Sequence, residues 1–97
     1  MIYEVRFQTV DPARRDEYLA LYTEALQPIK QAGARSVQVL GSEDDPARVL
    51  VLVEWESKEH HLRWREAPAR AKFRVAVEGS GLQTMPSEGG YYTGGPV

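Results

Sequence analysis

The residues best suited to chemistry in this chain lie between positions 55 and 74, where two histidines stand among tryptophans and arginines. An imidazole titrates at about pH 6.5, which suits proton transfer. His60 and His61 are neighbours, so on a helix they point about 100° apart and cannot hold one metal ion between them. The simple interpretation is that both face solvent or cap the helix. The functional one is that His61, near Leu62 and Trp64, faces a cavity and accepts a proton.

Aromatic residues around this segment are the candidates for lining such a cavity. Trp55 and Trp64 could form an aromatic pocket between helices and sheet, or pack in the core, as large apolar side chains commonly do. Tyr18 and Tyr22 lie one helical turn apart, and a buried phenol needs a hydrogen-bond partner. One of the two hydroxyls could therefore point into the cavity, although core packing is the alternative for both.

Arg70 and Arg74 also lie one helical turn apart, with Phe73 in the apolar stripe of the same segment. Guanidinium groups bind anionic or carbonyl-bearing ligands through two parallel donors. The alternative is a solvated helix face. The Glu-Asp-Asp run at 43–45 is a solvated turn, and the glycine pairs near the C-terminus do not lie between a strand and a helix, so no phosphate loop is predicted.

The first half of the chain predicts a strand, a helix and a hairpin. Residues 2–10 alternate as a strand, and Asp11-Pro12 starts a helix because Asp caps well and Pro tolerates the first position. The helix is expected to kink or end at Pro28 and to stop at Gly33. Strands at 35–40 and 47–55 flank the polar turn 41–46, which predicts an antiparallel hairpin.

The second half predicts two helices and a short strand. Ser57 is a candidate N-cap for a helix at 58–66, Pro68 interrupts it, and a further helix covers about 69–78. A fourth strand is expected at 82–85, then a turn at 87–90 and a brief extended piece at 91–93. The order is β-α-β-β-α-β, a ferredoxin-like α+β fold with an antiparallel sheet. We expect one domain over residues 1–93 and a flexible tail at 94–97.

Helices can cover only one face of the predicted sheet. The covered face is expected to carry the more apolar stripe of each strand, namely Tyr3, Val5, Phe7, Val37, Val39, Val49, Val51 and Val53. The other face would then show Ile2, Leu40, Leu50 and Leu52 among Glu4, Arg6, Gln8, Gln38 and Glu54. Leaving these aliphatic side chains in water would forfeit a few kcal/mol. We therefore expect a homodimer through this face; a half-wet sheet is the alternative.

Composition restricts the partners. A net charge of −2 with no basic block makes nucleic acid and anionic membranes poor partners. No cysteine is present, so disulfides and thiolate chemistry are excluded. No apolar run approaches the roughly 20 residues of a membrane-spanning helix, and no signal peptide is recognisable, so we expect a cytoplasmic protein.

One segment of the chain resembles a known family. A strand that ends in Trp55-Glu56-Ser57, a helix, Pro68 and then Phe73 follow one another within WESKEHHLRWREAPARAKF. With the element order and chain length, this segment resembles the antibiotic biosynthesis monooxygenase (ABM) domain of the dimeric α+β barrel superfamily. The opening, MIYEVRFQTVDPARRDEYLALY, is also similar to the start of NIPSNAP-type domains, which share the fold.

The resemblance can be carried over only in part. Many ABM sequences have a histidine where this chain has Trp64, and a tryptophan there is similar to the haem-degrading branch. That branch also has an axial histidine ten residues further on, where this chain has Arg74. It also needs an asparagine in the first strand, and the chain contains none. The resemblance therefore argues against haem degradation.

Two functions follow from the resemblance. The first is cofactor-independent monooxygenation of a quinol or other small aromatic, in which the substrate itself supplies electrons to O₂ and neither cofactor nor metal is expected. His61 and Trp64 would be catalytic, and the substrate would be bound by Tyr18, Tyr22, Trp55, Arg70, Phe73 and Arg74. The alternative is a non-catalytic, NIPSNAP-like dimeric module that binds a small hydrophobic ligand or a protein. The missing asparagine and the displaced histidine favour this alternative.

Overall fold

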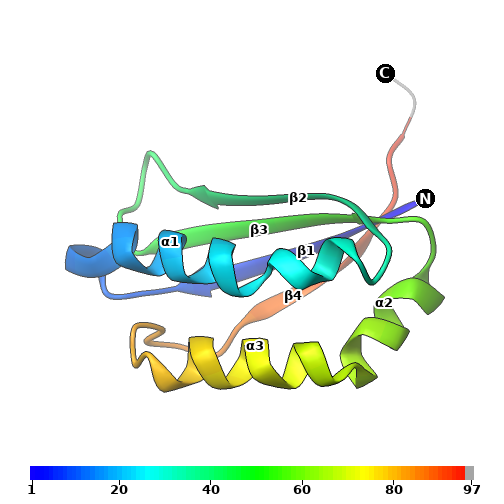
Figure 1. The fold of residues 1–97 in the computed structure, drawn as a ribbon. Helices are drawn as coiled ribbons and strands as arrows, with labels where there is room; N and C mark the ends of the chain where they lie inside the picture. Colours follow the sequence, from blue (N-terminus) through cyan, green and yellow to red (C-terminus); the bar gives the residue numbers. More distant parts are fainter. Residues whose placement is uncertain (96–97) are drawn as a thin grey trace.

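The computed structural model describes residues 1–95; residues 96–97, the end of the predicted tail, lie outside the described residues. Four strands form one antiparallel sheet in the order β2-β3-β1-β4, and the helices lie on one side of it (Figure 1). The elements are β1 (Ile2–Thr9), α1 (Arg15–Ala25), β2 (Ala34–Gly41), β3 (Arg48–Trp55), α2 (Lys58–Glu66), α3 (Pro68–Gly79) and β4 (Glu88–Tyr92). The predicted ferredoxin-like α+β order is confirmed.

The first helical region begins and ends where the sequence signals predict. The Asp11 side chain accepts a hydrogen bond of 3.0 Å from the Ala13 N–H, and a 3₁₀ turn at Pro12–Arg14 leads into α1. A second 3₁₀ turn, Gln27–Lys30, contains Pro28, and Gly33 adopts a left-handed φ of 108°. Since a proline interrupts helical hydrogen bonds and a glycine accepts positive φ at little cost, the region turns here into β2.

The second helical region is broken in two, as the proline predicts. Ala67, just before Pro68, has extended backbone, and α2 and α3 meet there at an angle (Figure 1). Ser57 occupies the predicted N-cap position of α2, but its hydroxyl contacts Nδ1 of His60 at 2.8 Å and makes no capping hydrogen bond to the backbone. Within residues 1–95, no helix combines the length and apolar character needed to cross a bilayer.

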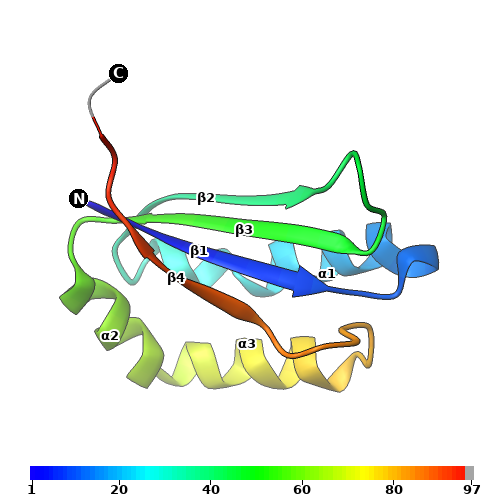
Figure 2. The ribbon, with the colours of Figure 1, turned by 180° about the vertical axis from the view of Figure 1, so that it is seen from behind.

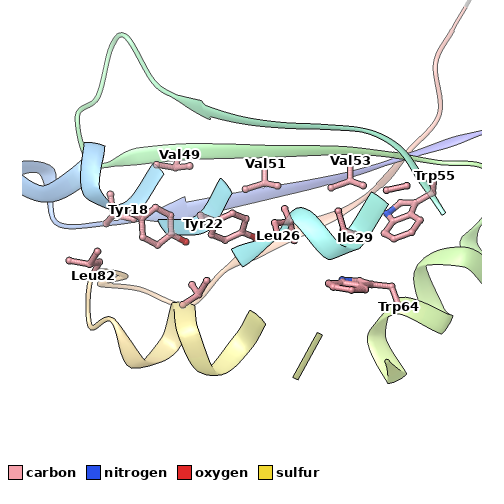
Figure 3. Close-up of a cluster of buried hydrophobic side chains, with 13 residues drawn as sticks. Tyr18, Tyr22, Leu26, Ile29, Val49, Val51, Val53, Trp55, Trp64 and Leu82 are labelled. Atoms are coloured by element: carbon pink, nitrogen blue, oxygen red, sulfur yellow. The ribbon is translucent and has the colours of Figure 1, made fainter. Parts of the chain in front are cut away.

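The core lies between β3 and the helical layer. Val49, Val51, Val53 and Trp55 point from β3 toward the helices, where they meet Tyr22, Leu26 and Ile29 from the first helical region and Trp64 from α2 (Figure 3). The residues of β3 on this face are each at most 2% exposed. Their alternation is the one predicted for that strand, and Val37 and Val39 of β2 lie on the same face.

The predicted orientation of β1 is wrong. Glu4, Arg6 and Gln8 pair with Val53, Val51 and Val49, so these polar side chains share the face that the helices cover. Tyr3, Val5 and Phe7 lie on the opposite face, and Phe7 is 37% exposed. The prediction failed because it placed the more apolar stripe of β1 under the helices, whereas the space there is partly a polar cavity.

The fourth strand also lies elsewhere than predicted. Residues 82–85 contribute only an isolated bridge between Gln83 and Val10, and β4 is formed by residues expected to be a turn and a brief extended piece. Within β4, Gly89 pairs with Arg6, and a Cβ at Gly89 would collide with the carbonyl oxygen of Val5. The glycine therefore allows close backbone approach inside the sheet, where a turn was predicted.

The face away from the helices is open in the single chain (Figure 2). Apolar side chains lie on it beside Gln38, Arg48 and Glu54, and Leu40 and Tyr92 are 43% and 55% exposed. We call it the open face; its apolar members, by strand register, are Tyr3, Val5, Phe7, Leu40, Leu50, Leu52 and Tyr92.

Candidate functional site

A cavity of about 630 Å³ lies between the covered face of the sheet and the helices. Its size is that of a pocket for a small organic molecule. The polar stripe of β1 forms one wall, α2 and α3 form others, and the 83–87 segment closes one end. The lining includes Glu4, Arg6, Gln8, Tyr22, His61, Trp64, Arg65, Arg70, Phe73, Arg74, Val77 and Glu78.

His61 is the buried histidine of this wall and is 4% exposed. Its Nε2 lies 3.2 Å from Oε2 of Glu4, and its Nδ1 forms a short contact with the Tyr91 hydroxyl. The ring also packs on Trp55, with centroids 5.3 Å apart, and meets Tyr91 edge-on. The imidazole is thus held at both nitrogens and on its face, which leaves it little freedom to rotate.

Glu4 is 7% exposed yet ionised. Burial alone would raise its pKa, but contacts with His61, Trp55 and Arg6 stabilise the carboxylate more and hold the pKa at about 2. The Trp55 indole N–H donates to Oε1 at 3.1 Å, and Nε of Arg6 donates to Oε2 at 3.0 Å. Glu4 is therefore negatively charged at neutral pH beside the imidazole, and it is too weak a base to accept a proton from the substrate.

The Tyr91 hydroxyl fits either protonation state of His61, because a phenol both donates and accepts. Tyr91 reaches His61 from the edge strand β4, opposite Glu4 in the register. In the neutral ring, the Nε2–H of His61 donates to the ionised Glu4 carboxylate, and the Tyr91 hydroxyl donates to Nδ1. When Nδ1 takes up a proton, the Tyr91 hydroxyl accepts instead, and the imidazolium still faces Glu4. The arrangement can therefore store a proton beside the cavity.

Aromatic side chains form the apolar part of the cavity. Tyr22 and Phe73 pack edge-to-face with ring centroids 5.0 Å apart, and Trp64 is 4% exposed. Burial and the negative charge of Glu4 raise the pKa of Tyr22 to about 12, so its hydroxyl stays protonated at neutral pH. These rings offer stacking surfaces for a flat ligand.

The predicted site residues divide into two groups. His61, Trp64, Tyr22, Phe73, Arg70 and Arg74 all line the cavity. Tyr18 and Trp55 do not: Tyr18 is buried beside Tyr22 with its hydroxyl 3.4 Å from Oε1 of Gln83, and Trp55 lies behind the wall, where it holds Glu4. His60 is half-buried, contacts the Ser57 hydroxyl and lies outside the cavity lining.

Four side chains near the site were missed from the sequence: Glu4, Arg6, Gln8 and Tyr91. The first three were assigned to the other face of β1, and Tyr91 to an irregular segment. One signal was available for the strand. Glu4, Arg6 and Gln8 form an unbroken polar stripe, while both stripes of the central partner strand 48–55 are largely apolar, as in a strand buried on both faces. Either face of β1 could therefore have been covered.

Metal binding finds no support in the site. Among residues 1–95, no three side chains of His, Asp or Glu are grouped so that they could hold a metal ion. Glu4 and His61 are engaged with each other, and the remaining charged groups of the lining are mostly arginines.

The fold and the cavity define the class: a ferredoxin-like α+β domain with a ligand-sized space between sheet and helices. The chain belongs to the antibiotic biosynthesis monooxygenase family, whose model matches residues 1–76. That range contains the cavity lining except for the end of α3, at residues 77 and 78, and the segment 83–87. None of the curated proteins matches the chain.

Solved structures show the same fold at low sequence identity. A Bordetella bronchiseptica protein named for this family superposes with a TM-score of 0.87 and 22% identity, over 98% of this chain and 97% of that one. A monooxygenase from the gene ActVA-Orf6 of Streptomyces coelicolor, in complex with nanaomycin D, gives 0.85 and 23%, over 99% and 88%. SnoaB, a cofactor-independent oxygenase from Streptomyces nogalater, gives 0.73 and 20%, over 99% and 94%.

Proposed function

We propose that this protein is a cofactor-independent monooxygenase that oxidises a quinol or another small electron-rich aromatic in the cavity. The observation that supports it most is the buried Glu4–His61–Tyr91 chain on the wall of an aromatic-lined space of about 630 Å³. Family membership agrees, and two relatives of the same fold are described as oxygenases.

The reaction needs only the substrate and O₂. A phenol loses its hydroxyl proton and becomes a phenolate, which is a better electron donor. O₂ then takes four electrons from the ring: one oxygen atom enters as a new carbonyl, the other leaves as water, and the product is a quinone. In sum, a phenol and O₂ give a quinone and water, so atoms and electrons balance without an external reductant.

The protein would contribute a proton acceptor, orientation and exclusion of water. We assign the acceptor role to Nδ1 of His61, because Nε2–H donates to the Glu4 carboxylate at 3.2 Å, and that negative charge stabilises the imidazolium that forms. Tyr91 is a positioning residue that holds Nδ1 in either state of the ring. Trp64, Tyr22 and Phe73 would hold the aromatic ring against the sheet.

We further propose that the protein acts as a homodimer through the open face. Seven apolar side chains gather there, and leaving them in water would cost a small domain a substantial part of its stability. Because the cavity lies on the opposite, helix-covered face, such a dimer would leave it free.

Oxygen consumption tests the function. Purified protein treated with a chelator is incubated with naphthols, anthrones and benzene- and naphthoquinols, and O₂ uptake is compared with that of substrate alone. We expect uptake above the spontaneous rate. His61→Gln should reduce it by about 100-fold, the low end of the effect of general-base loss. His60→Gln is the matched control, since this neighbour contacts Ser57 and does not line the cavity.

Two results would contradict the proposal: no uptake across the panel, or equal rates for wild type and His61→Gln. Saturable binding of the same compounds without uptake would instead favour the non-catalytic binding module.

A further inference from the structure

The arginines of the cavity are not balanced by acids. Arg6, Arg65, Arg70 and Arg74 all line it, whereas the acidic lining residues are Glu4 and Glu78. Glu4 pairs with Arg6 at 3.0 Å and Glu78 with Arg74 at 2.8 Å. Within residues 1–95, no carboxylate forms an ion pair with Arg65 or Arg70.

The four arginines gather at one cavity although the whole chain has a net charge of −2. Partial burial, and then the positive charges of Arg74 and Arg65, lower the pKa of Arg70. Each of these effects disfavours the charged guanidinium. A cluster of positive charges at a cavity attracts anions, and an anion bound between the arginines would offset their mutual repulsion.

A second, independent feature points to a ligand. Gln8 is 4% exposed, and its Oε1 has no hydrogen-bond partner within the described part of the chain. Gln8 lines the same cavity. A buried carbonyl oxygen without a partner is costly, and a ligand hydroxyl would satisfy it because the oxygen can only accept.

We propose that the cavity binds a hydroxylated aromatic acid, with its carboxylate on Arg65 and Arg70 and a ring hydroxyl donating to Gln8. Tyr22 and Phe73 lie among these polar groups and supply the apolar surface for the ring. This substrate class deepens the proposed oxygenase function and rests on the same cavity. The binding itself does not depend on turnover.

Isothermal titration calorimetry under anaerobic conditions tests whether the ligand carboxylate contributes to binding. The probes are 6-hydroxy-2-naphthoate and its uncharged counterpart 2-naphthol. We expect the acid to bind wild type at least ~10-fold more tightly than the naphthol, as charge-assisted hydrogen bonds do. Arg70→Gln should remove most of that advantage. Arg63→Gln is the matched control, because Arg63 is exposed and absent from the cavity lining.

The hydroxyl is tested by comparing 6-hydroxy-2-naphthoate with 2-naphthoate. Wild type should prefer the hydroxylated acid by roughly 5–10-fold, and Gln8→Leu should abolish that preference. On wild type alone, affinity for the acid should fall as salt rises from 20 to 300 mM, while affinity for 2-naphthol should not.

The proposal is overturned if the acid and 2-naphthol bind equally, or if Arg70→Gln and Arg63→Gln behave alike. The salt series needs no variant, so the result does not depend on how Arg70→Gln folds. Tight binding of the acid without O₂ uptake would retain this inference and reject the oxygenase. O₂ uptake with neutral aromatics only would retain the oxygenase and reject the aromatic acid as its ligand.

Discussion

Glu4 is the residue on which the site depends most. It is buried, it accepts from Trp55 and Arg6, and it faces the imidazole of His61. A buried carboxylate is tolerated only when such partners replace water. Removing its charge would therefore leave both Arg6 and His61 without their acidic neighbour.

Stability should fall in acid because of this group. The pKa of Glu4 is about 2 in the folded protein against an ordinary 4.5, so the unfolded state binds the proton more readily. Its contribution is present above about pH 4.5 and is lost as pH falls toward 2; a shift of this size corresponds to about 3 kcal/mol. Urea unfolding between pH 7 and pH 2.5 measures it.

Glu4→Gln gives the matching control for this titration. The variant should be less stable than wild type at pH 7 and should lose less stability between pH 5 and pH 2.5. If wild type and variant show the same slope in that window, Glu4 does not titrate as described.

Tyr91→Phe should lower kcat by about 10-fold, because the ring of His61 loses the contact that holds Nδ1. KM should change little, since Tyr91 does not line the cavity. The pH profile of kcat should shift as well, which mere loosening of the strand would not produce. Tyr92→Phe, on the opposite face of the same strand, is the control.

Among the elements, β1 and β4 are the two that were predicted wrongly from the sequence. β3 was placed correctly because its valines and Trp55 mark the covered face, and the breaks at Pro28 and Pro68 were placed correctly because proline has strict backbone requirements. The orientation of β1 was not deducible from its own alternation, since a polar stripe suits either solvent or a polar cavity. For His61 and Trp64 the sequence left a solvent-facing or core position open as the alternative, and the structure places both side chains in the cavity lining.

Substitutions at the two adjacent glycines of β4 test how closely the backbones of β4 and β1 approach each other. Gly89→Ala should destabilise the protein by about 2 kcal/mol, because the new Cβ meets the Val5 carbonyl oxygen and the Arg6 side chain. Gly90→Ala should be nearly neutral, since nothing lies within 4 Å of its added Cβ. Thermal unfolding measures both. Equal effects of the two substitutions would contradict the register of β4.

For the whole molecule, the orientation of β1, opposite to the predicted one, changes which residues lie on the open face. The sequence predicted a face on which aliphatic residues are mixed with Glu4 and Arg6. The structure places those two charges at the cavity and leaves a more apolar face. The proposed dimer is therefore held mainly by apolar contact, which is less sensitive to salt.

Leu50→Glu should convert the dimer to a monomer, because a carboxylate in an apolar contact has no partner to offset its desolvation. We expect the dissociation constant to rise at least ~100-fold, measured by analytical ultracentrifugation. Val75→Glu places the same charge on α3, where Val75 is 73% exposed, and should leave the dimer intact. A wild type that sediments as a monomer at micromolar concentration would contradict the proposed assembly.

The most direct test of the account is the fate of 18O-labelled dioxygen. Chelator-treated protein is given a phenolic substrate that supports O₂ uptake, and the product quinone and the water are analysed by mass spectrometry. The account predicts one labelled oxygen atom in the quinone and one in water, at a rate about 100-fold lower in His61→Gln and unchanged in His60→Gln. Unlabelled quinone with labelled hydrogen peroxide, or a rate independent of His61, would contradict it.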